Sequence, residues 1–406
     1  MRHFLLATAG FILPLGAPAF AAEPVQGPPT PAPAASEAEP AKAPAKKSEW
    51  EFKPRWRLQY DFANVSGPVG LAGTGNSEEI RRAQLGVDIK MPGGFSARVE
   101  GEFTADPVEF VDAYVAWNGD GINVTAGQQK FFSPLDDMTS DLNTSFTERA
   151  ALVTAFNFSR RTGLSAGYAK GDFQINAGIA TDPFIQLDDV EDNSISADMR
   201  AVWMPQFGKT KLHFGAAWHW KHRRDSETVP VRYRQRPLVH STGTRYIATP
   251  GLLAEREQTY GVEAAAVNGP FHFASEAYWQ HASRDGASDP TFFGAYAEVG
   301  FFLTKGDSRP LKGGQFGAIK PKKPLGDGGI GAVQVNARYD YLDLNDAGIT
   351  GGTQKGYMAS IIWSPTSWMR LMAQYARLNY RDAAIAVAGD RDYGVDVVGA
   401  RVQFTY

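Results

Sequence analysis

Basic side chains stand at both ends of one long polar segment of this sequence. Lys130 comes just before residues 132–161, and the pair Arg160–Arg161 closes them. An arginine offers an oxyanion two parallel hydrogen bonds from its planar guanidinium group, whereas a lysine acts as a point charge. A second set of arginines lies on alternating stretches elsewhere, at Arg55, Arg57, Arg82 and Arg98. These residue types predict a row of cations along which small anions bind and move.

The same segment contains acidic residues, at Asp136, Asp137 and Glu148, and Arg149 follows the last of them. Glu148 and Arg149 have the types of a catalytic acid and its partner, but no serine or histidine stands near them in a triad-like arrangement. Asp136, Asp137 and Asp141 lack the fixed glycine and the terminal glutamate of a calcium loop. We therefore expect ion pairs that hold the segment in place and form part of a constriction.

Other common sites are missing from the sequence. It contains no cysteine and no glycine-rich phosphate loop ending in Gly-Lys before Ser or Thr. His213 and His219 lie six residues apart on one stretch, too far apart to share a metal ion. The net charge of -3 gives no reason to expect a nucleic-acid partner. We predict no catalytic residues, no metal and no cofactor, so we do not expect an enzyme.

The elements that would position these side chains are β-strands. From Trp50 onward, apolar and polar residues alternate in stretches of the length that a tilted strand needs to cross a membrane. Turn residues separate sixteen such stretches, which are 50–62, 80–91, 95–104, 108–117, 122–131, 162–169, 173–180, 195–204, 211–222, 258–267, 271–283, 291–304, 331–344, 354–363, 368–380 and 392–406. These stretches predict an all-β fold, a transmembrane antiparallel β-barrel of 16 strands with inward-folded loops. The even number of strands is the one that bacterial barrels of this kind have.

The alternation also assigns side chains to the two faces of the barrel wall. Lipid is expected around an apolar set, which includes Trp56, Leu58, Trp218 and Phe404. The lumen is expected around a polar set, which includes Arg57, His219 and Gln403. The lumen faces carry as many acidic as basic side chains, the acids including Asp61, Glu100, Glu298 and Asp396. Wall charge therefore leaves two interpretations open: a path for anions, or paired charges that hold inward-folded segments.

The N-terminal residues predict export from the cytoplasm. A basic start and an apolar run precede Ala19-Phe20-Ala21, an A-x-A cleavage site, so residues 1–21 are expected to be a signal peptide. Residues 22–48 are rich in proline, alanine and lysine and cannot form a core, so we expect a disordered linker. Residues 49–406 then form the barrel domain, in the outer membrane of a Gram-negative bacterium.

An ordered set of short motifs resembles one family of bacterial outer-membrane proteins. Residues 127–130 read G-Q-Q-K, residues 146–149 read F-T-E-R, and residues 160–163 read R-R-T-G. The run G-D-S-R at 306–309 and the closing 399–404 follow in the same order. Over about residues 50–406 the chain is similar to the phosphate-selective porins O and P. Lys130 matches the family's lysine, although residues 131–134 depart from the family's order.

The resemblance implies a homotrimer of sixteen-stranded barrels in which the loop at about 132–161 folds inward and narrows the lumen. It also implies that segments 225–257 and 305–330, both rich in arginine or lysine, bend inward. The implied function is a passive, anion-preferring channel for phosphate or polyphosphate. Outer-membrane lipid and small inorganic anions would be its partners. A general or sugar-type porin stays open as an alternative, as does an outer-membrane barrel with a structural or enzymatic role.

Overall fold

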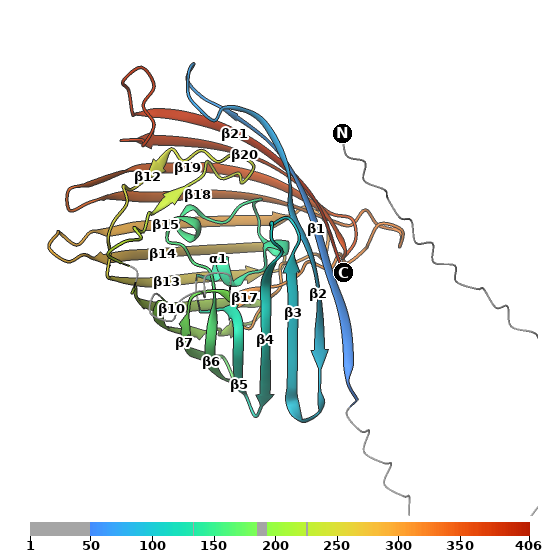
Figure 1. Ribbon diagram of the computed structural model, residues 1–406. Helices are drawn as coiled ribbons and strands as arrows, with labels where there is room; N and C mark the ends of the chain where they lie inside the picture. Colours follow the sequence, from blue (N-terminus) through green and yellow to red (C-terminus); the bar gives the residue numbers. More distant parts are fainter. Residues whose placement is uncertain (1–48, 133, 185–192, 225) are drawn as a thin grey trace, which may run out of the picture. The chain divides into compact units, whose positions relative to one another are not determined.

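A computed structural model describes residues 49–132, 134–184, 193–224 and 226–406. The expected signal peptide and linker, residues 1–48, lie outside the described residues. Sixteen antiparallel strands form one closed barrel, as the alternation predicts (Figure 1). The strands are β1 (Glu51–Ser66), β2 (Gly75–Lys90), β3 (Phe95–Glu102), β4 (Glu109–Gly119), β5 (Ile122–Lys130), β6 (Arg160–Lys170), β7 (Phe173–Thr181), β8 (Ile195–Trp203), β10 (Thr210–His222), β13 (Arg256–Asn268), β14 (Phe271–Ser283), β15 (Thr291–Phe302), β18 (Ala332–Asp346), β19 (Ile349–Ser364), β20 (Met369–Arg381) and β21 (Tyr393–Thr405).

The last strand closes the barrel against the first. Strand β1 pairs with β2 on one side and with β21 on the other, so the sheet has no edge there. Leu58 lies opposite Phe404 in this seam, and Gln59 Nε2 donates to the Oε1 of Gln403 at 2.9 Å on the lumen side. A closed sheet satisfies every backbone group that would otherwise face hydrocarbon, where no water can pair with it.

The exposure of the side chains confirms the predicted register. Trp56 and Leu58 are 40% and 39% exposed on the outer face, whereas Arg57 is 8% exposed inside the barrel. The prediction that Asp396 faces the lumen is wrong, because its side chain points outward and pairs with Arg377 at 2.6 Å. Its neighbours Val395 and Val397 are the buried residues of that stretch. Close to the loop-bearing end of the strand the outer face is already polar, so an acidic residue there does not mark the lumen.

Several strands run further than the apolar alternation predicted. Strands β1 and β2 extend to Ser66 and from Gly75, and their outer faces carry the hydrogen-bonded pair Asn64 and Asn76. Strands β18 and β19 meet in a tight turn at Ala347, where a longer connection was expected. The backbone ladder continues past the point at which the outer side chains cease to be apolar, so the hydrophobic pattern ends before the strand does.

The connections differ between the two ends of the barrel. At one end, called the turn end, they are short, with 3-10 turn η1 (Pro92–Gly94) and strand β9 (Gln206–Phe207) among them; the exception is residues 303–331. At the other end, called the loop end, residues 131–159 and 223–255 form long connections. Short turns and long loops mark the periplasmic and external ends of outer-membrane barrels.

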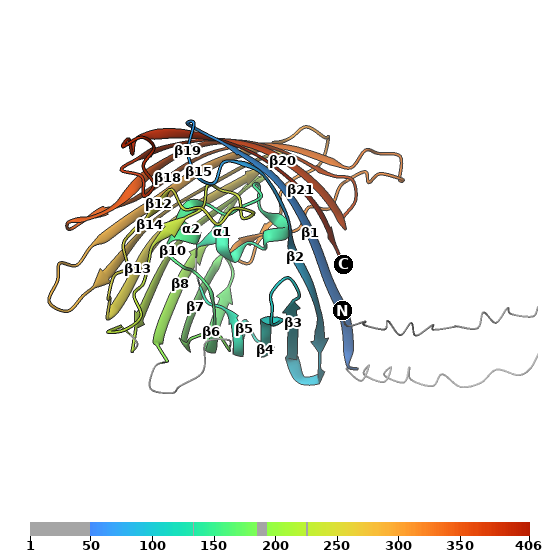
Figure 2. The ribbon, with the colours of Figure 1, turned by 45° about the horizontal axis from the view of Figure 1, so that its top comes forward.

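Three of the long connections fold into the barrel (Figure 2). Residues 131–159, called the inner loop, contain α1 (Leu135–Met138), the 3-10 turn η2 (Asp141–Asn143) and α2 (Ala151–Ala155). Residues 223–255 carry the hairpin of β11 (Arg234–Gln235) and β12 (Ile247–Ala248), and residues 303–331 that of β16 (Leu311–Lys312) and β17 (Gln315–Phe316). Their apolar side chains join one buried cluster inside the wall, which includes Phe146, Leu152, Tyr233, Tyr246 and Phe316. No helix in the described part of the chain is long and apolar enough to cross a membrane.

The register predicts the effect of a charge on the outer face. Leu58→Arg should lower the free energy of unfolding by about 2–4 kcal/mol, because the new charge would face hydrocarbon. Leu58→Ile is the matched control and should leave stability nearly unchanged. Urea unfolding of the protein from lipid vesicles, followed by tryptophan fluorescence, measures both. Equal stability of the two variants would mean that position 58 does not face lipid.

Candidate functional site

Carboxylates of the barrel wall hold the inner loop by its backbone. The Leu135 amide donates to Glu263 at 3.0 Å and to Glu276 at 2.7 Å. Further along, the Ala151 amide donates to Asp340 at 3.0 Å. All three carboxyl groups are buried, at 1–4% exposure. A buried carboxylate without a donor is costly, so these contacts restrict where α1 and α2 can lie.

Arginines hold the middle of the same loop by its carbonyl groups. Arg370, on β20, donates to the carbonyl oxygens of Leu142 at 2.7 Å and Thr144 at 2.5 Å. Arg309, from the connection at the turn end, donates to the carbonyl oxygen of Asn143 at 3.0 Å. The inner loop is therefore fixed to the side of the barrel formed by β13 to β21. Toward the opposite side, formed by β1 to β6, a space remains, and side-chain ion pairs such as Arg81 with Glu148 cross it.

A cavity of about 1600 Å³ occupies this space. Among the described residues that line it, eleven are basic: Arg55, Arg57, Arg81, Arg82, Arg98, Lys130, Arg149, Arg160, Lys221, Arg223 and Arg401. Six are acidic: Asp112, Asp137, Asp141, Glu148, Asp182 and Glu257. The described lining therefore carries an excess of positive charge.

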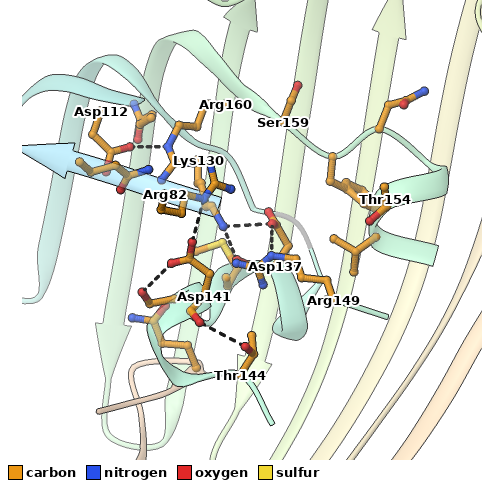
Figure 3. A pocket seen from close by; sticks show the side chains of 18 of the residues that line it. Arg82, Asp112, Lys130, Asp137, Asp141, Thr144, Arg149, Thr154, Ser159 and Arg160 are labelled. Atoms are coloured by element: carbon orange, nitrogen blue, oxygen red, sulfur yellow. Dashed lines mark hydrogen bonds and ion pairs between the residues drawn. The ribbon is translucent and has the colours of Figure 1, made fainter. Parts of the chain in front are cut away.

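Within the cavity, a carboxylate is often shared between two cations (Figure 3). Asp137 lies 3.0 Å from the Nζ of Lys130 and 3.4 Å from the Nε of Arg149. Asp112 accepts from Arg160 at 2.7 Å, and a second arginine reaches it from β3. A guanidinium group has five N–H donors in a fixed plane, and one shared carboxylate cannot use all of them. Pairing therefore positions these cations and leaves donors available to a further anion.

Two acids of the inner loop, Asp141 and Glu148, are held in the ionised form. Burial alone would raise the pKa of Asp141, but the charges of Arg57 and Arg82 hold it well below its usual value. Burial would likewise raise the pKa of Glu148, whereas Arg81 and Arg401 lower it to about 2. Both carboxylates therefore stay charged at neutral pH and keep four cations ordered along the wall.

Most of the residues that the sequence singled out meet at this cavity. Arg55, Arg57, Arg82, Arg98, Lys130 and Arg160 line it, as do Asp137, Glu148 and Arg149 of the inner loop. Arg161 and Asp136 lie behind the lining. Arg161 donates to Asp198 at 2.7 Å and stacks on the ring of Phe131, 5.0 Å from its centroid. Asp136 accepts from the Ala150 amide at 2.8 Å.

Sequence reasoning missed Arg81. A β-bulge between Gln59 and Tyr60 of β1 inserts one extra residue into β2, so Arg81 and Arg82 both point inward. Arg81 then pairs with Glu148 at 3.0 Å. Strict alternation would place either Arg81 or Arg82 in lipid. Two adjacent arginines in a membrane strand therefore indicate that the strand is irregular at this point.

The basic inward segments contribute less to the cavity than their composition suggested. Both bend inward, as the resemblance implied, and Arg223 beside the first of them lines the cavity. Arg309 of the second is buried 2.8 Å from Glu298, away from the lining. His213 and His219 also face inward, each beside a carboxylate, Glu263 for the first and Asp198 for the second. No cluster of possible metal ligands occurs in the described ranges.

Comparison with known proteins agrees with this geometry. The model of the phosphate-selective porins O and P matches residues 52–406. The chain belongs to this family. An uncharacterized protein of Caulobacter vibrioides is 43% identical over 365 residues, which are 87% of this chain and 74% of that protein. The protein is thus an outer-membrane porin of a Gram-negative bacterium, as the sequence predicted.

Solved structures share the fold of this porin. OmpT of Vibrio cholerae has a TM-score of 0.57 and 10% identity, and the match covers 89% of this chain and 99% of that one. An anion-selective porin from Comamonas acidovorans has a TM-score of 0.56 and 13% identity, with 88% of this chain and 100% of that one covered. At such low identity the likeness concerns the sixteen-stranded barrel alone.

The inner loop predicts a change in the conductance of this porin. Replacing residues 135–156 with a short glycine–serine linker should raise single-channel conductance by about twofold or more, because the loop fills one side of the lumen. Planar-bilayer recordings measure it. If conductance stays at the wild-type value in a correctly folded variant, the loop does not narrow the path.

The low pKa of Glu148 predicts the pH range over which the loop is held. A carboxylate with a depressed folded pKa stabilises the fold fully above its ordinary value of 4.5 and loses that effect as the pH falls toward 2. Current noise should stay constant from pH 7 to pH 5 and rise below pH 4. Glu148→Gln should show the raised noise already at pH 7, whereas the exposed control Glu227→Gln should not. A quiet Glu148→Gln channel would mean that the Arg81 and Arg401 pairs do not restrain the loop.

Proposed function

We propose that this porin is a passive channel that prefers anions, with phosphate or polyphosphate as its cargo. The observation that supports the proposal is the excess of basic side chains around the cavity beside the inner loop. Inside a narrow pore whose wall has a low dielectric constant, such an excess attracts anions more strongly than the same charges would in water. The geometry of the arginines favours oxyanions, whose oxygens accept paired hydrogen bonds.

The cations are spaced so that an ion can leave one as it approaches the next. Arg160 and Arg98 both contact Asp112, at 2.7 and 3.6 Å. Arg98 then shares Asp88 with Arg55, at 2.6 and 2.9 Å. This chain of arginines follows the wall from the loop end toward the turn end. Conduction needs several such weak sites in series, because one strong site would trap the ion.

The remaining proposals concern assembly and chemistry. We propose a homotrimer in outer-membrane lipid; a trimer form is described for OmpT of Vibrio cholerae, whose barrel is similar. We propose no catalytic role, because the described lining of the cavity contains no histidine that could activate one of its serine or threonine hydroxyls. The name of the Comamonas acidovorans porin, anion-selective, agrees with the proposed preference.

The proposal predicts the effect of a charge reversal at Lys130. Lys130→Glu should lower the chloride-to-potassium permeability ratio and weaken the block of chloride current by phosphate by about tenfold, which is about 1.4 kcal/mol of lost attraction. The matched control is Lys170→Glu, at an exposed turn outside the cavity, which should conduct like the wild type. If Lys130→Glu folds and keeps both the ratio and the block, the lysine only holds Asp137, and the phosphate proposal loses its main support.

A further inference from the structure

The cavity changes character along strands β3 to β5. Toward the loop end it is lined by ion pairs such as Arg98 with Asp112. Toward the turn end the same three strands contribute Ser96, Asn118, Asn123 and Thr125, all uncharged and all in the lining. One continuous wall therefore has a charged part followed by a neutral, hydrogen-bonding part.

The neutral part offers acceptors as well as donors. Asn123 Nδ2 donates to the Oδ1 of Asn118 at 2.7 Å, and Thr125 Oγ1 donates to the Oδ1 of Asn123 at 3.1 Å. Amide and hydroxyl oxygens repel the oxygens of a bare phosphate ion, but they accept hydrogen bonds from hydroxyl groups. An inorganic phosphate ion has only one or two hydroxyl groups at neutral pH, so a polyhydroxylated solute can use more of these acceptors.

Tyr114 stands at the boundary between the two parts. Its ring lines the cavity, and the guanidinium carbon of Arg98 lies 5.8 Å from the ring centroid. In the described part of the chain its hydroxyl makes no hydrogen bond. An aromatic ring combines a flat apolar face with a polar tip, so it suits a solute that has C–H faces and hydroxyl groups.

We propose that the preferred cargo is a phosphate ester of a hydroxylated carbon skeleton, such as a hexose phosphate, and that Tyr114 is its specificity residue. The phosphate group binds the cations around Arg98, and the carbon skeleton lies on the Tyr114 ring. The hydroxyl groups of the skeleton bind Ser96 and Thr125, which lie two residues further along the paired strands. A cavity of about 1600 Å³ has room for such a solute. The inference rests on the proposed anion channel and names the class of anion.

The test compares two blockers in the same channel. Chloride current through single channels is titrated with glucose 6-phosphate and, separately, with inorganic phosphate. In the wild type, glucose 6-phosphate should block at lower concentration than inorganic phosphate. Tyr114→Ala should weaken the block by glucose 6-phosphate about fivefold and leave the block by inorganic phosphate unchanged. The matched control Tyr168→Ala, 45% exposed on the outer face, should alter neither.

Three results would overturn the inference. Glucose 6-phosphate that blocks no better than inorganic phosphate in the wild type contradicts the cargo class, while the proposed anion channel survives. A loss of both blocks in Tyr114→Ala would make the tyrosine a structural support for the cations; Tyr114→Phe, which keeps the ring, shows whether the pore itself is intact. If neither anion blocks the wild type, the proposed phosphate function and this inference fail together.

Discussion

The arrangement inside this barrel depends on one constraint: carboxyl groups buried on the inner face of the wall need hydrogen-bond donors. Glu263, Glu276 and Asp340 lie on strands β13, β14 and β18, away from the cavity. They accept hydrogen bonds from backbone N–H groups of the inner loop, at Leu135 and Ala151. Removing such a donor would leave a buried carboxyl oxygen without its hydrogen bond in a region that water barely reaches. The loop is therefore fixed to one side of the lumen.

Fixing the loop also explains how a wall with balanced charges gives an unbalanced cavity. Acids on β13 to β18 are used to hold the inner loop, together with Arg309 and Arg338, which both contact Glu298. On the opposite side, the arginines of β1 to β3 line the cavity, whereas wall carboxylates that pair with them, such as Asp88 and Glu100, lie outside its lining. Selectivity in this account arises from where the charges lie and not from their sum.

Much of the fold was predictable from alternation alone. A period of two residues identifies strands wherever one face meets lipid, so the sixteen strands and the facing of Trp56 and Arg57 followed from the pattern. The predicted strand ends were less accurate, because the pattern depends on hydrocarbon and the backbone ladder does not. Asp396 shows the limit: near the loop end the outer face is polar, and polarity no longer separates lumen from surroundings.

The candidate site was predictable in its residue types but not in its pairing. Lys130 and Arg160 were expected at the cavity from their place at the ends of the inner loop. Arg161, their neighbour, is instead paired with Asp198 behind the lining, a contact across 37 residues that no local pattern indicates. Arg81 enters the lumen through a bulge, whose position depends on the partner strand. Long-range pairs and bulges are set by the assembled barrel.

The most direct measurement of the central claim is the zero-current potential of the wild-type channel in a gradient of potassium chloride across a planar bilayer. The account predicts the sign that corresponds to chloride being more permeant than potassium. It also predicts that adding phosphate lowers the chloride current without abolishing the preference. A potential near zero, or one of the opposite sign, would mean that the basic side chains around the cavity are neutralised by their partners and would contradict the account.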